Sequence, residues 1–330
     1  MRGDFMRPLA AAAAFCLCSP CLVSSAHAGK TTLFDVPGCT GAYSFAINAS
    51  GIIAGDCGSG GFLRYADGTF TSFAVPGTYY TDATALNDNG QVAGWYITNN
   101  NGPYFGFIRA PDGTVESFSI SGAQDMEVTG INNEGTVVGA YTANGALHGF
   151  LRDQNGSITS FDAPDSSYTE PASVNEAGAV AGGTVGHDGV VYGFIRASDG
   201  TVSRFSGPNN ATYTWGLSLN ISETVLGYYR DADGIQHGLL RTGDGAIASF
   251  DPPGAEATYP YGLNSKGAVA GETRIEGNLD RGFVRNPNGK FKVFKVRQYP
   301  NIVTTAINDD GTVTGDVVSD RHSHCFFRTK

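Results

Sequence analysis

Short apolar runs separated by glycine-rich turns return along the chain at a nearly constant interval. Each repeat contains an apolar residue, an asparagine, two variable residues, a glycine in most copies, and a short apolar run ending in glycine. The repeated asparagines are Asn48, Asn87, Asn132, Asn175, Asn220, Asn264 and Asn308. They lie 39 to 45 residues apart, which is the length of one four-stranded blade of a β-propeller. The pattern therefore predicts seven similar units of β-structure.

Two more repeated stretches complete the predicted unit. A Gly-Phe-x-Arg stretch, such as 106–109, precedes Asp-Gly or Asn-Gly in six copies, and these dipeptides favour tight β-hairpins. An alternating strand with a phenylalanine near its end follows each hairpin. In the second unit, the three patterns predict strands at 84–87, 91–96, 104–110 and 114–120.

The order of these stretches predicts how the chain closes. The phenylalanine-bearing strand occurs once before the first asparagine, at 31–34, whereas the last unit ends at Lys330, where its own copy would begin. We therefore expect the N-terminal strand to form the outermost strand of the last blade, which removes both open sheet edges. An open β-solenoid would explain the period but not this offset. The predicted fold is an all-β, seven-bladed β-propeller of four-stranded blades.

The first 28 residues have the pattern of a secretory signal peptide. Basic residues precede an apolar run at 9–17, and Ala26-His27-Ala28 precedes the expected cleavage point. No later stretch reaches the roughly 18 continuous apolar residues that a membrane helix needs. We expect a secreted or periplasmic protein without a transmembrane segment, with residues 29–330 forming one monomeric propeller domain.

The charge balance narrows the class of partner. The chain has 21 Lys and Arg residues against 31 Asp and Glu residues, a net charge of -10. An acidic protein repels phosphate, so nucleic acid and anionic lipid are not expected as partners.

Three cysteines remain after removal of the predicted signal peptide. Cys39 follows a Pro-Gly turn between units, and Cys57 ends the second predicted strand of the first unit. Both positions face the same end of the propeller, so we predict a Cys39–Cys57 disulfide. Cys325 replaces the glycine of the Gly-Phe-x-Arg stretch and is expected to be buried as a free thiol.

The repeats resemble the HAF-repeat family of extracellular bacterial repeat proteins. The family's Ile-Asn-x-x-Gly-x-x-x-Gly stretch is best kept at 131–139, and its His-Gly-Phe stretch at 148–150. The histidine returns at His237 and His324. The resemblance implies export and a repeated β-fold, and it implies no reaction.

Residues present in every unit are interpreted first as structural. The asparagines could form a ring of ligands around a central channel, but Asn87-Asp-Asn-Gly90 has the spacing of a type I turn, which explains the repeat without a ligand. The repeated arginine could bind an anion. Because a buried charge must be paired, packing against carbonyl groups or a neighbouring blade is the favoured interpretation.

Residues that differ between units are the candidates for binding. Tyrosine, tryptophan and histidine gather in the segments expected to form loops at one face, and an aromatic body with a polar tip suits a glycan or a protein surface. The candidate ligand-binding residues are Tyr79, Tyr80, Tyr168, His187, Tyr213, Trp215, Tyr259 and Tyr261. The alternative is that they only cover blade edges.

Candidate metal and catalytic residues form no recognisable motif. The turn at 231–234 lacks the further oxygen ligands of a calcium loop, and alternate residues of 322–325 point to opposite faces of a strand. We therefore expect neither a metal nor another cofactor. The acids and histidine near the predicted loops are Asp82, Asp125, Glu127, Glu170 and His187.

These observations favour an exported binding or interaction scaffold whose ligand face is formed by aromatic inter-strand loops. The alternative is an exported hydrolase or lyase acting on polysaccharide or a small ester, using the acids and histidine named above. A cell-surface structural protein without a small ligand is the third candidate.

Overall fold

The computed structural model of the chain describes residues 29–330 except 101, 278, 298 and 319–322. The predicted signal peptide at 1–28 and His322 therefore lie outside the described residues. The described chain forms 28 strands, β1 to β28, and one short 3-10 helix, Pro208–Asn210. The all-β expectation is confirmed.

Four sheets have four strands each, and all their neighbouring strands are antiparallel. The first contains β2 (Ala42–Ile47), β3 (Ile53–Cys57), β4 (Gly60–Arg64) and β5 (Phe70–Phe73). The second contains β6 (Tyr80–Leu86), β7 (Val92–Ile97), β8 (Tyr104–Arg109) and β9 (Val115–Phe118). The third contains β22 (Ala257–Leu263), β23 (Val269–Ile275), β24 (Leu279–Arg285) and β25 (Phe291–Phe294). The fourth contains β26 (Ile302–Ile307), β27 (Val313–Val318), β28 (Ser323–Arg328) and β1 (Thr31–Phe34).

The remaining strands belong to one sheet of twelve. Its first four are β10 (Asp125–Ile131), β11 (Val137–Ala143), β12 (Ala146–Arg152) and β13 (Ile158–Phe161). Next come β14 (Ser166–Val174), β15 (Val180–Gly186), β16 (Val191–Arg196) and β17 (Val202–Phe205). The last are β18 (Tyr213–Leu219), β19 (Val225–Arg230), β20 (Gln236–Arg241) and β21 (Ile247–Phe250). Only two single parallel residue pairs, Leu147 with Tyr168 and Val191 with Tyr213, join these three groups.

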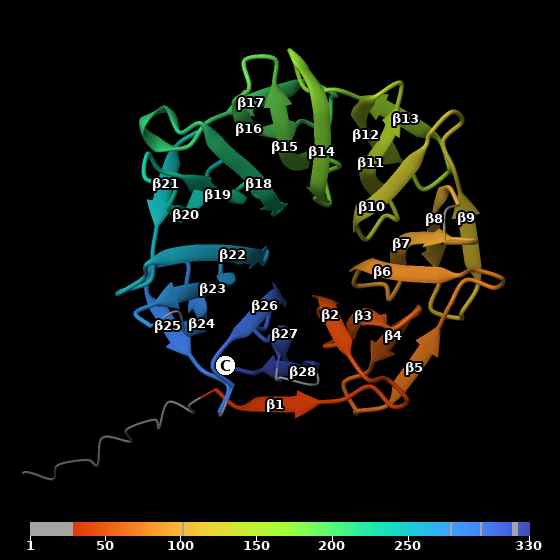
Figure 1. Cartoon of the computed structure of the whole chain (residues 1–330), viewed down its shortest axis with the longest axis horizontal. Coiled ribbons are helices and arrows are strands. Elements are labelled where there is room, and N and C mark those ends of the chain that lie inside the picture. Colours follow the sequence, from red (N-terminus) through yellow and green to blue (C-terminus); the bar gives the residue numbers. More distant parts are fainter. Residues whose placement is uncertain (1–28, 101, 278, 298, 319–322) are drawn as a thin grey trace, which may run out of the picture.

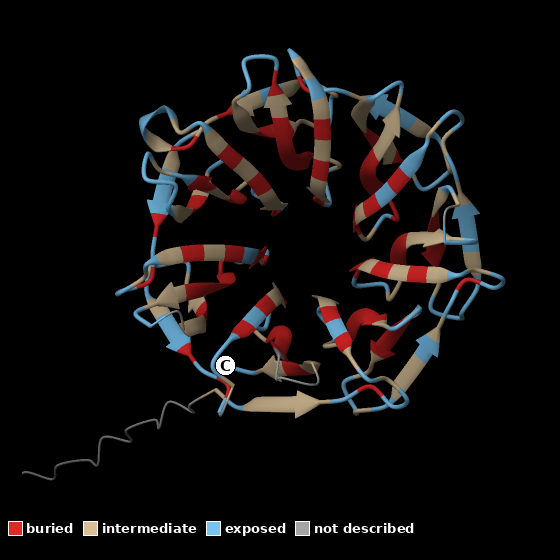
Figure 2. Ribbon diagram, in the orientation of Figure 1, coloured by how far each residue is buried: buried red, intermediate tan, exposed pale blue. Residues whose placement is uncertain are grey.

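The sheets stand in a ring around a central opening (Figure 1). Strand β1 lies beside β28, and Thr31 pairs with Arg328 across them. The two ends of the chain thus share one sheet, as the offset of the repeats predicts. Buried residues occur mainly on the first three strands of each unit, whereas the outermost strands are mostly intermediate or exposed (Figure 2).

The repeated asparagine bonds both within its own turn and to the next unit. In the second unit, the Asn87 Oδ1 accepts the Gln91 backbone N–H at 2.9 Å, and the Asn87 Nδ2 donates to the Asn132 carbonyl at 2.9 Å. All seven asparagines accept from the residue four positions later. Six donate to the next asparagine, including Asn308 to Asn48 across the closure. We call this set the asparagine ring.

The repeated arginine lies over a phenylalanine of the preceding unit. Its guanidinium carbon is 4.9 Å from the Phe73 ring centre for Arg109, and all seven copies have an equivalent cation–π contact. Arg109 also donates to the carbonyl of Ala110. These contacts join neighbouring units, which gives the repeated arginine a structural role.

A glycine on each second strand permits close approach of the backbone. At Gly94, a Cβ atom would lie 1.9 Å from the Asp82 carbonyl oxygen and 2.8 Å from the Phe107 ring. Only glycine fits there, so the glycine that ends each apolar run is explained by packing.

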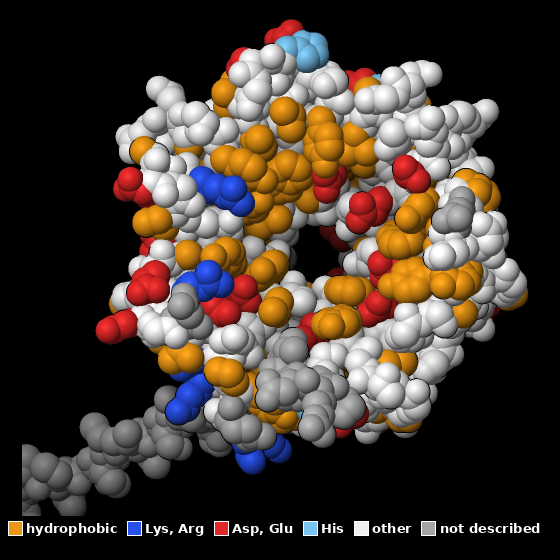
Figure 3. All heavy atoms as spheres, viewed as in Figure 1, with side chains coloured by type: hydrophobic (Ala, Val, Ile, Leu, Met, Phe, Trp, Pro, Cys, Tyr) orange, Lys and Arg blue, Asp and Glu red, His pale blue; other side chains and the backbone are white. Residues whose placement is uncertain are grey.

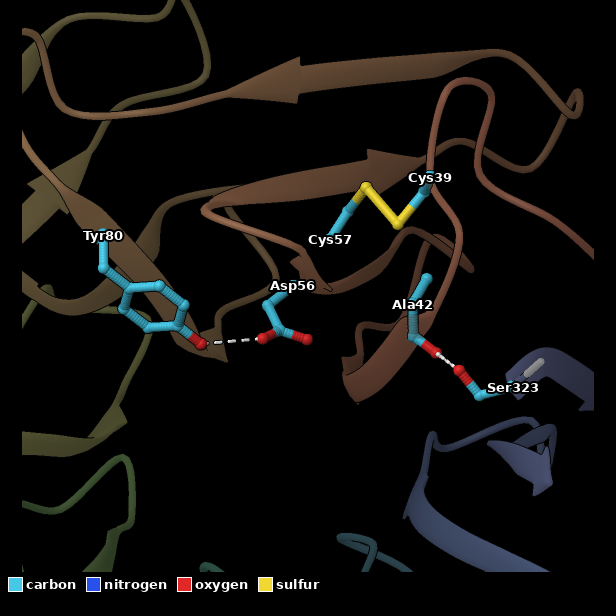
Figure 4. Close-up of a disulfide and its surroundings, with 6 residues drawn as sticks. All are labelled: Cys39, Ala42, Asp56, Cys57, Tyr80 and Ser323. Atoms are coloured by element: carbon cyan, nitrogen blue, oxygen red, sulfur yellow. Dashed lines mark hydrogen bonds between the residues drawn. A yellow bond between two sulfur atoms is a disulfide. The ribbon is translucent and has the colours of Figure 1, made fainter. Parts of the chain in front are cut away.

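Cys39 and Cys57 form a disulfide between the β1–β2 loop and the end of β3 (Figure 4). Cys325 is a free cysteine with 1% of its surface exposed.

Replacing Asn87 with alanine should lower the free energy of unfolding by about 2 to 3 kcal/mol, because a buried carbonyl and a turn N–H lose their partners. Urea unfolding measures the change. Gln154→Ala, at an exposed turn, is the control and should cost less than about 0.5 kcal/mol. Equal effects of the two substitutions would contradict a structural role for the asparagine ring.

Peptide mapping without reduction should recover Cys39 linked to Cys57, and Cys325 as a free thiol. Substituting both linked cysteines with serine should lower the free energy of unfolding by about 3 kcal/mol, because the loop of 18 residues is no longer closed. Recovery of Cys325 in a disulfide would show the pairing to be wrong.

Candidate functional site

One level of the ring carries residues that change from unit to unit. It consists of the residue five positions before each repeated asparagine and its partner on the second strand, and we call these seven pairs the mouth pairs. They are Tyr43 with Asp56, Asp82 with Trp95, Glu127 with Ala140, Glu170 with Gly183, Trp215 with Tyr228, Tyr259 with Glu272, and Val303 with Asp316. Six pairs contain a carboxyl group, and the remaining pair has two aromatic rings.

A β-bulge follows the mouth pair in every unit. The register shifts between Asp82 and Ala85 in the second unit, and equivalent shifts occur in the other six. A bulge bends the strand and redirects side chains. The same irregularity at the same level places all mouth pairs at one end of the central channel.

Beside these pairs lies a cavity of about 430 Å³ between the second, third and fourth units. Its lining residues are Trp95, Tyr104, Asp125, Met126, Glu127, Ala140, Tyr141, Thr142, Leu147, Tyr168 and Glu170. We call it the acidic–aromatic cavity. Figure 3 shows acidic side chains bordering the central opening, with hydrophobic side chains gathered next to them.

The aromatic rings of this region contact one another at an angle. The Trp95 ring lies 4.9 Å from Tyr104 with a tilt of 45° and 5.6 Å from Tyr80 with a tilt of 38°. Tyr168 contacts Trp215 edge-on, and Trp215 stacks with Tyr213. Aromatic side chains therefore continue from the cavity along the mouth toward the fifth unit.

The carboxyl groups of the mouth influence each other's ionisation. Burial, together with the negative charges of Asp56 and Glu127, raises the pKa of Asp82 to about 7. Desolvation and the charge of Glu170 raise the pKa of Glu127. Asp82 Oδ1 and Trp95 Nε1 are buried and have no hydrogen-bond partner among the described residues. The acids on this side of the mouth therefore hold their protons more tightly than free carboxyl groups do.

Two tyrosines donate to carboxylates at the same level. The Tyr80 hydroxyl donates to Asp56 at 2.9 Å (Figure 4), and the Tyr168 hydroxyl donates to Glu170. Burial raises the pKa of Asp56 despite this bond. The hydrogen bonds fix the orientation of both carboxylates.

The other side of the mouth is acidic but more enclosed. Burial raises the pKa of Glu272 to about 7, and Tyr261 donates to its carboxylate at 3.4 Å. Burial also raises the pKa of Asp316 to about 7, and its carboxylate accepts from the backbone N–H and hydroxyl of Ser44.

The aromatic residues expected in loops lie mostly on strands, which corrects the predicted loop face. Tyr80, Tyr168, Tyr213, Trp215, Tyr259 and Tyr261 belong to inner strands, whereas Tyr79 and His187 lie in loops. The inner strand of the second unit begins at Tyr80 instead of residue 84. Burial alternates along this strand, but the buried positions are Thr81, Ala83 and Ala85, so hydrophobicity in the sequence does not mark its start.

Of the eight candidates, only Tyr168 lines the acidic–aromatic cavity. Tyr80 contacts its Trp95 wall, while Tyr259 and Tyr261 lie on the opposite side of the ring. Three of the four acids of the alternative enzyme hypothesis, Asp125, Glu127 and Glu170, line the cavity together. The fourth, Asp82, and His187 are not in the lining, and burial is the main cause of the raised pKa of Asp82.

Several residues of the site were missed from the sequence. Trp95 and Tyr141 follow the apolar run of the second strand and were counted as part of the repeat, and Asp56, Glu272 and Asp316 occupy related positions. The available signal was the variability, from unit to unit, of the one or two residues that follow the glycine at the end of that run.

The opposite end of the channel is built from the asparagine turns. A cavity of about 390 Å³ there is lined partly by Asp88, Glu176 and Asp309. Each of these carboxylates accepts a backbone N–H from the preceding unit. Their role is explained by turn-to-turn bonding.

No group of three or more His, Cys, Asp or Glu residues is arranged to hold a metal ion in the described part of the chain. The 231–234 turn is closed by a hydrogen bond from the Gly234 N–H to the Asp231 carbonyl. His237 lies between Asp231 and Asp251, at 3.2 and 2.8 Å. His324 contacts Asp35 at 2.6 Å.

No protein-family model matches the chain, and no curated protein matches it in sequence. Its structure is similar to virginiamycin B lyase from Staphylococcus aureus, with 14% identity, a TM-score of 0.61, and coverage of 92% of this chain and 99% of that one. It is also similar to the β-propeller domain of the Trilobed protease from Pyrococcus furiosus, with 11% identity, a TM-score of 0.52, and coverage of 75% and 82%.

The fold is a β-propeller. The Dos1 propeller is a further similar structure, at 12% identity and a TM-score of 0.50, covering 84% of this chain and 75% of that one. At these identities the similarity extends to the fold alone. Within the described residues, no helix is long and apolar enough to span a membrane.

Asp82→Asn should make the protein more stable at pH 8 and reduce the pH dependence of its stability. The folded-state pKa of Asp82 is raised to about 7, so its proton is held more tightly in the folded chain than in the unfolded one. The contribution of Asp82 therefore falls as pH rises from about 4 through 7. Urea unfolding at pH 5 and pH 8 measures this, and an unchanged pH dependence would contradict the assigned environment.

Proposed function

We propose that the protein is an exported binding scaffold and that its ligand face is the channel end carrying the mouth pairs and the acidic–aromatic cavity. The observation that carries this proposal is that each unit contains constant structural positions and, at one level, variable positions. The asparagine, arginine and second-strand glycine have structural contacts in every unit, whereas the mouth pairs vary. Variation at one level of a regular ring gives a surface with different chemistry on each side.

The composition of the face supports a polar ligand with flat or apolar parts. Tryptophan and tyrosine offer rings for a sugar or an aliphatic chain, and carboxylates accept hydrogen bonds from hydroxyl or ammonium groups. A glycan or a protein segment meets these requirements. A cavity of about 430 Å³ is large enough for one or two small ligand groups.

We also propose that the propeller has seven blades. The twelve-stranded sheet then counts as three blades, because single parallel residue pairs alone join its groups. The same proposal includes membership of the HAF-repeat family, export directed by residues 1–28, and a monomeric state. The seven repeats support the family membership.

An enzyme is the second candidate, and one observation favours it. Asp125, Glu127 and Glu170 share a cavity, and the pKa of neighbouring Asp82 is about 7. A carboxyl group with a raised pKa beside other carboxyl groups is an arrangement used for acid–base catalysis. A hydrolase or lyase would therefore act in the same cavity.

A glycan-array binding assay tests both candidate functions. The full chain is expressed and the purified protein is applied to the array, and release of products from any retained glycan is monitored. Trp95→Ala and Tyr168→Ala should each weaken binding of a retained glycan at least tenfold, because each removes a ring wall. Ile221→Ala, an exposed apolar residue at the opposite channel end, is the control.

Retention without turnover supports the scaffold, and turnover that is lost in Glu127→Gln supports the enzyme. Retention that survives both ring substitutions would place the ligand face elsewhere. If no glycan is retained, a protein ligand is required, and cross-linking to a bound protein should then map to the same channel end.

A further inference from the structure

The acidic–aromatic cavity is lined by two kinds of group that attract organic cations. Asp125, Glu127 and Glu170 contribute carboxylates, and Trp95, Tyr104, Tyr141 and Tyr168 contribute rings. No Lys, Arg or His is found among the described residues that line it. None of its three carboxylates takes part in the ion pairs of the described chain.

Elsewhere on the same channel end, the chain supplies its own cation to similar rings. Arg230 lies 4.5 Å from the ring centre of Tyr213, and Arg274 lies 5.6 Å from that of Tyr259. Arg274 also pairs with Asp280. In the fifth unit, therefore, an arginine covers an aromatic ring, and in the sixth unit an arginine lies between an aromatic ring and a carboxylate.

The strand register identifies the equivalent positions in the second and third units. Arg230 and Arg274 each lie two residues after the second-strand member of a mouth pair. The same position is Ile97 in the second unit and Thr142 in the third, and Thr142 lines the cavity. Where two units carry a guanidinium, the units around the cavity carry neutral side chains.

The aromatic rings of the lining also favour a cationic ligand. Trp95 and Tyr104 both line the cavity, and their ring centres lie 4.9 Å apart at a tilt of 45°. A cation within about 6 Å of such rings is attracted by the ring quadrupoles, and organic ammonium groups are bound in this way. The adjoining carboxylates add direct charge attraction.

We infer that the acidic–aromatic cavity binds the ammonium group of a small organic ligand, which takes the place that Arg230 and Arg274 fill in other units. This inference rests on the proposed function and specifies the chemistry of its ligand. Choline carries a quaternary ammonium group and ethanolamine a primary one, and these two compounds serve as the probes.

Isothermal titration calorimetry tests the inference. Protein purified after expression of the full chain is titrated with choline, ethanolamine and 3,3-dimethylbutan-1-ol. The last compound has the shape of choline without its charge. We expect at least one of the two ammonium probes to bind at least tenfold more tightly than the neutral alcohol. Equal binding of the alcohol and the ammonium probes, or no binding of either ammonium probe, would overturn the inference.

Two substitutions localise the site. Glu127→Gln should weaken ammonium binding at least tenfold, and Thr142→Arg should abolish it by placing a guanidinium in the cavity. Glu176→Gln makes the same chemical change at the opposite channel end and should leave binding unchanged. Urea unfolding of each variant separates loss of the site from loss of the fold.

Ammonium binding that persists in both cavity variants would assign it to another surface and overturn the inference. Glycan or protein binding that depends on Trp95, with no ammonium binding, would overturn the inference while leaving the proposed binding scaffold intact. The two proposals therefore fail on different results.

Discussion

The asparagine ring is the interaction on which the rest of this structure depends. One side-chain amide both closes its own turn through Oδ1 and reaches the next unit through Nδ2, so local and long-range structure share the same group. Burial makes an unpaired amide costly. The inner strands are therefore held at one height, and the bond from Asn308 to Asn48 extends this order across the junction of the two chain ends.

Because the inner strands are held at the same position along the channel, the mouth pairs of all seven units lie at one level. The side chains at that level differ from unit to unit. Bulges repeat there because the second-strand glycine brings the two backbones together at that point. Carboxyl groups can accumulate at this level because the folding of the ring depends on contacts elsewhere. Burial and, to a lesser degree, the charges of neighbouring carboxylates raise the pKa values of Asp82 and Glu127.

The sequence predicted the features that arise from repetition and turn chemistry. The Asn-x-x-Gly turns, the hairpins after Gly-Phe-x-Arg and the pairing of β1 with β28 all follow from local rules or from the order of the repeats. The bond from one asparagine to the next was not foreseen, because a turn explains the residue without any neighbour. The same reasoning placed Tyr80 and Trp215 in loops. Burial does alternate along β6, but its buried positions hold Thr81, Ala83 and Ala85, so the hydrophobicity of the residues does not mark the buried side.

A substitution scan of the seven asparagines and the seven mouth pairs, with folded yield and ligand retention measured for every variant, tests the central claim most directly. The account predicts that asparagine variants lose folded protein, whereas mouth-pair variants stay folded and lose retention in a sector around Trp95 and Glu127. Mouth-pair variants that unfold the protein, together with asparagine variants that fold normally and lose the ligand, would contradict it.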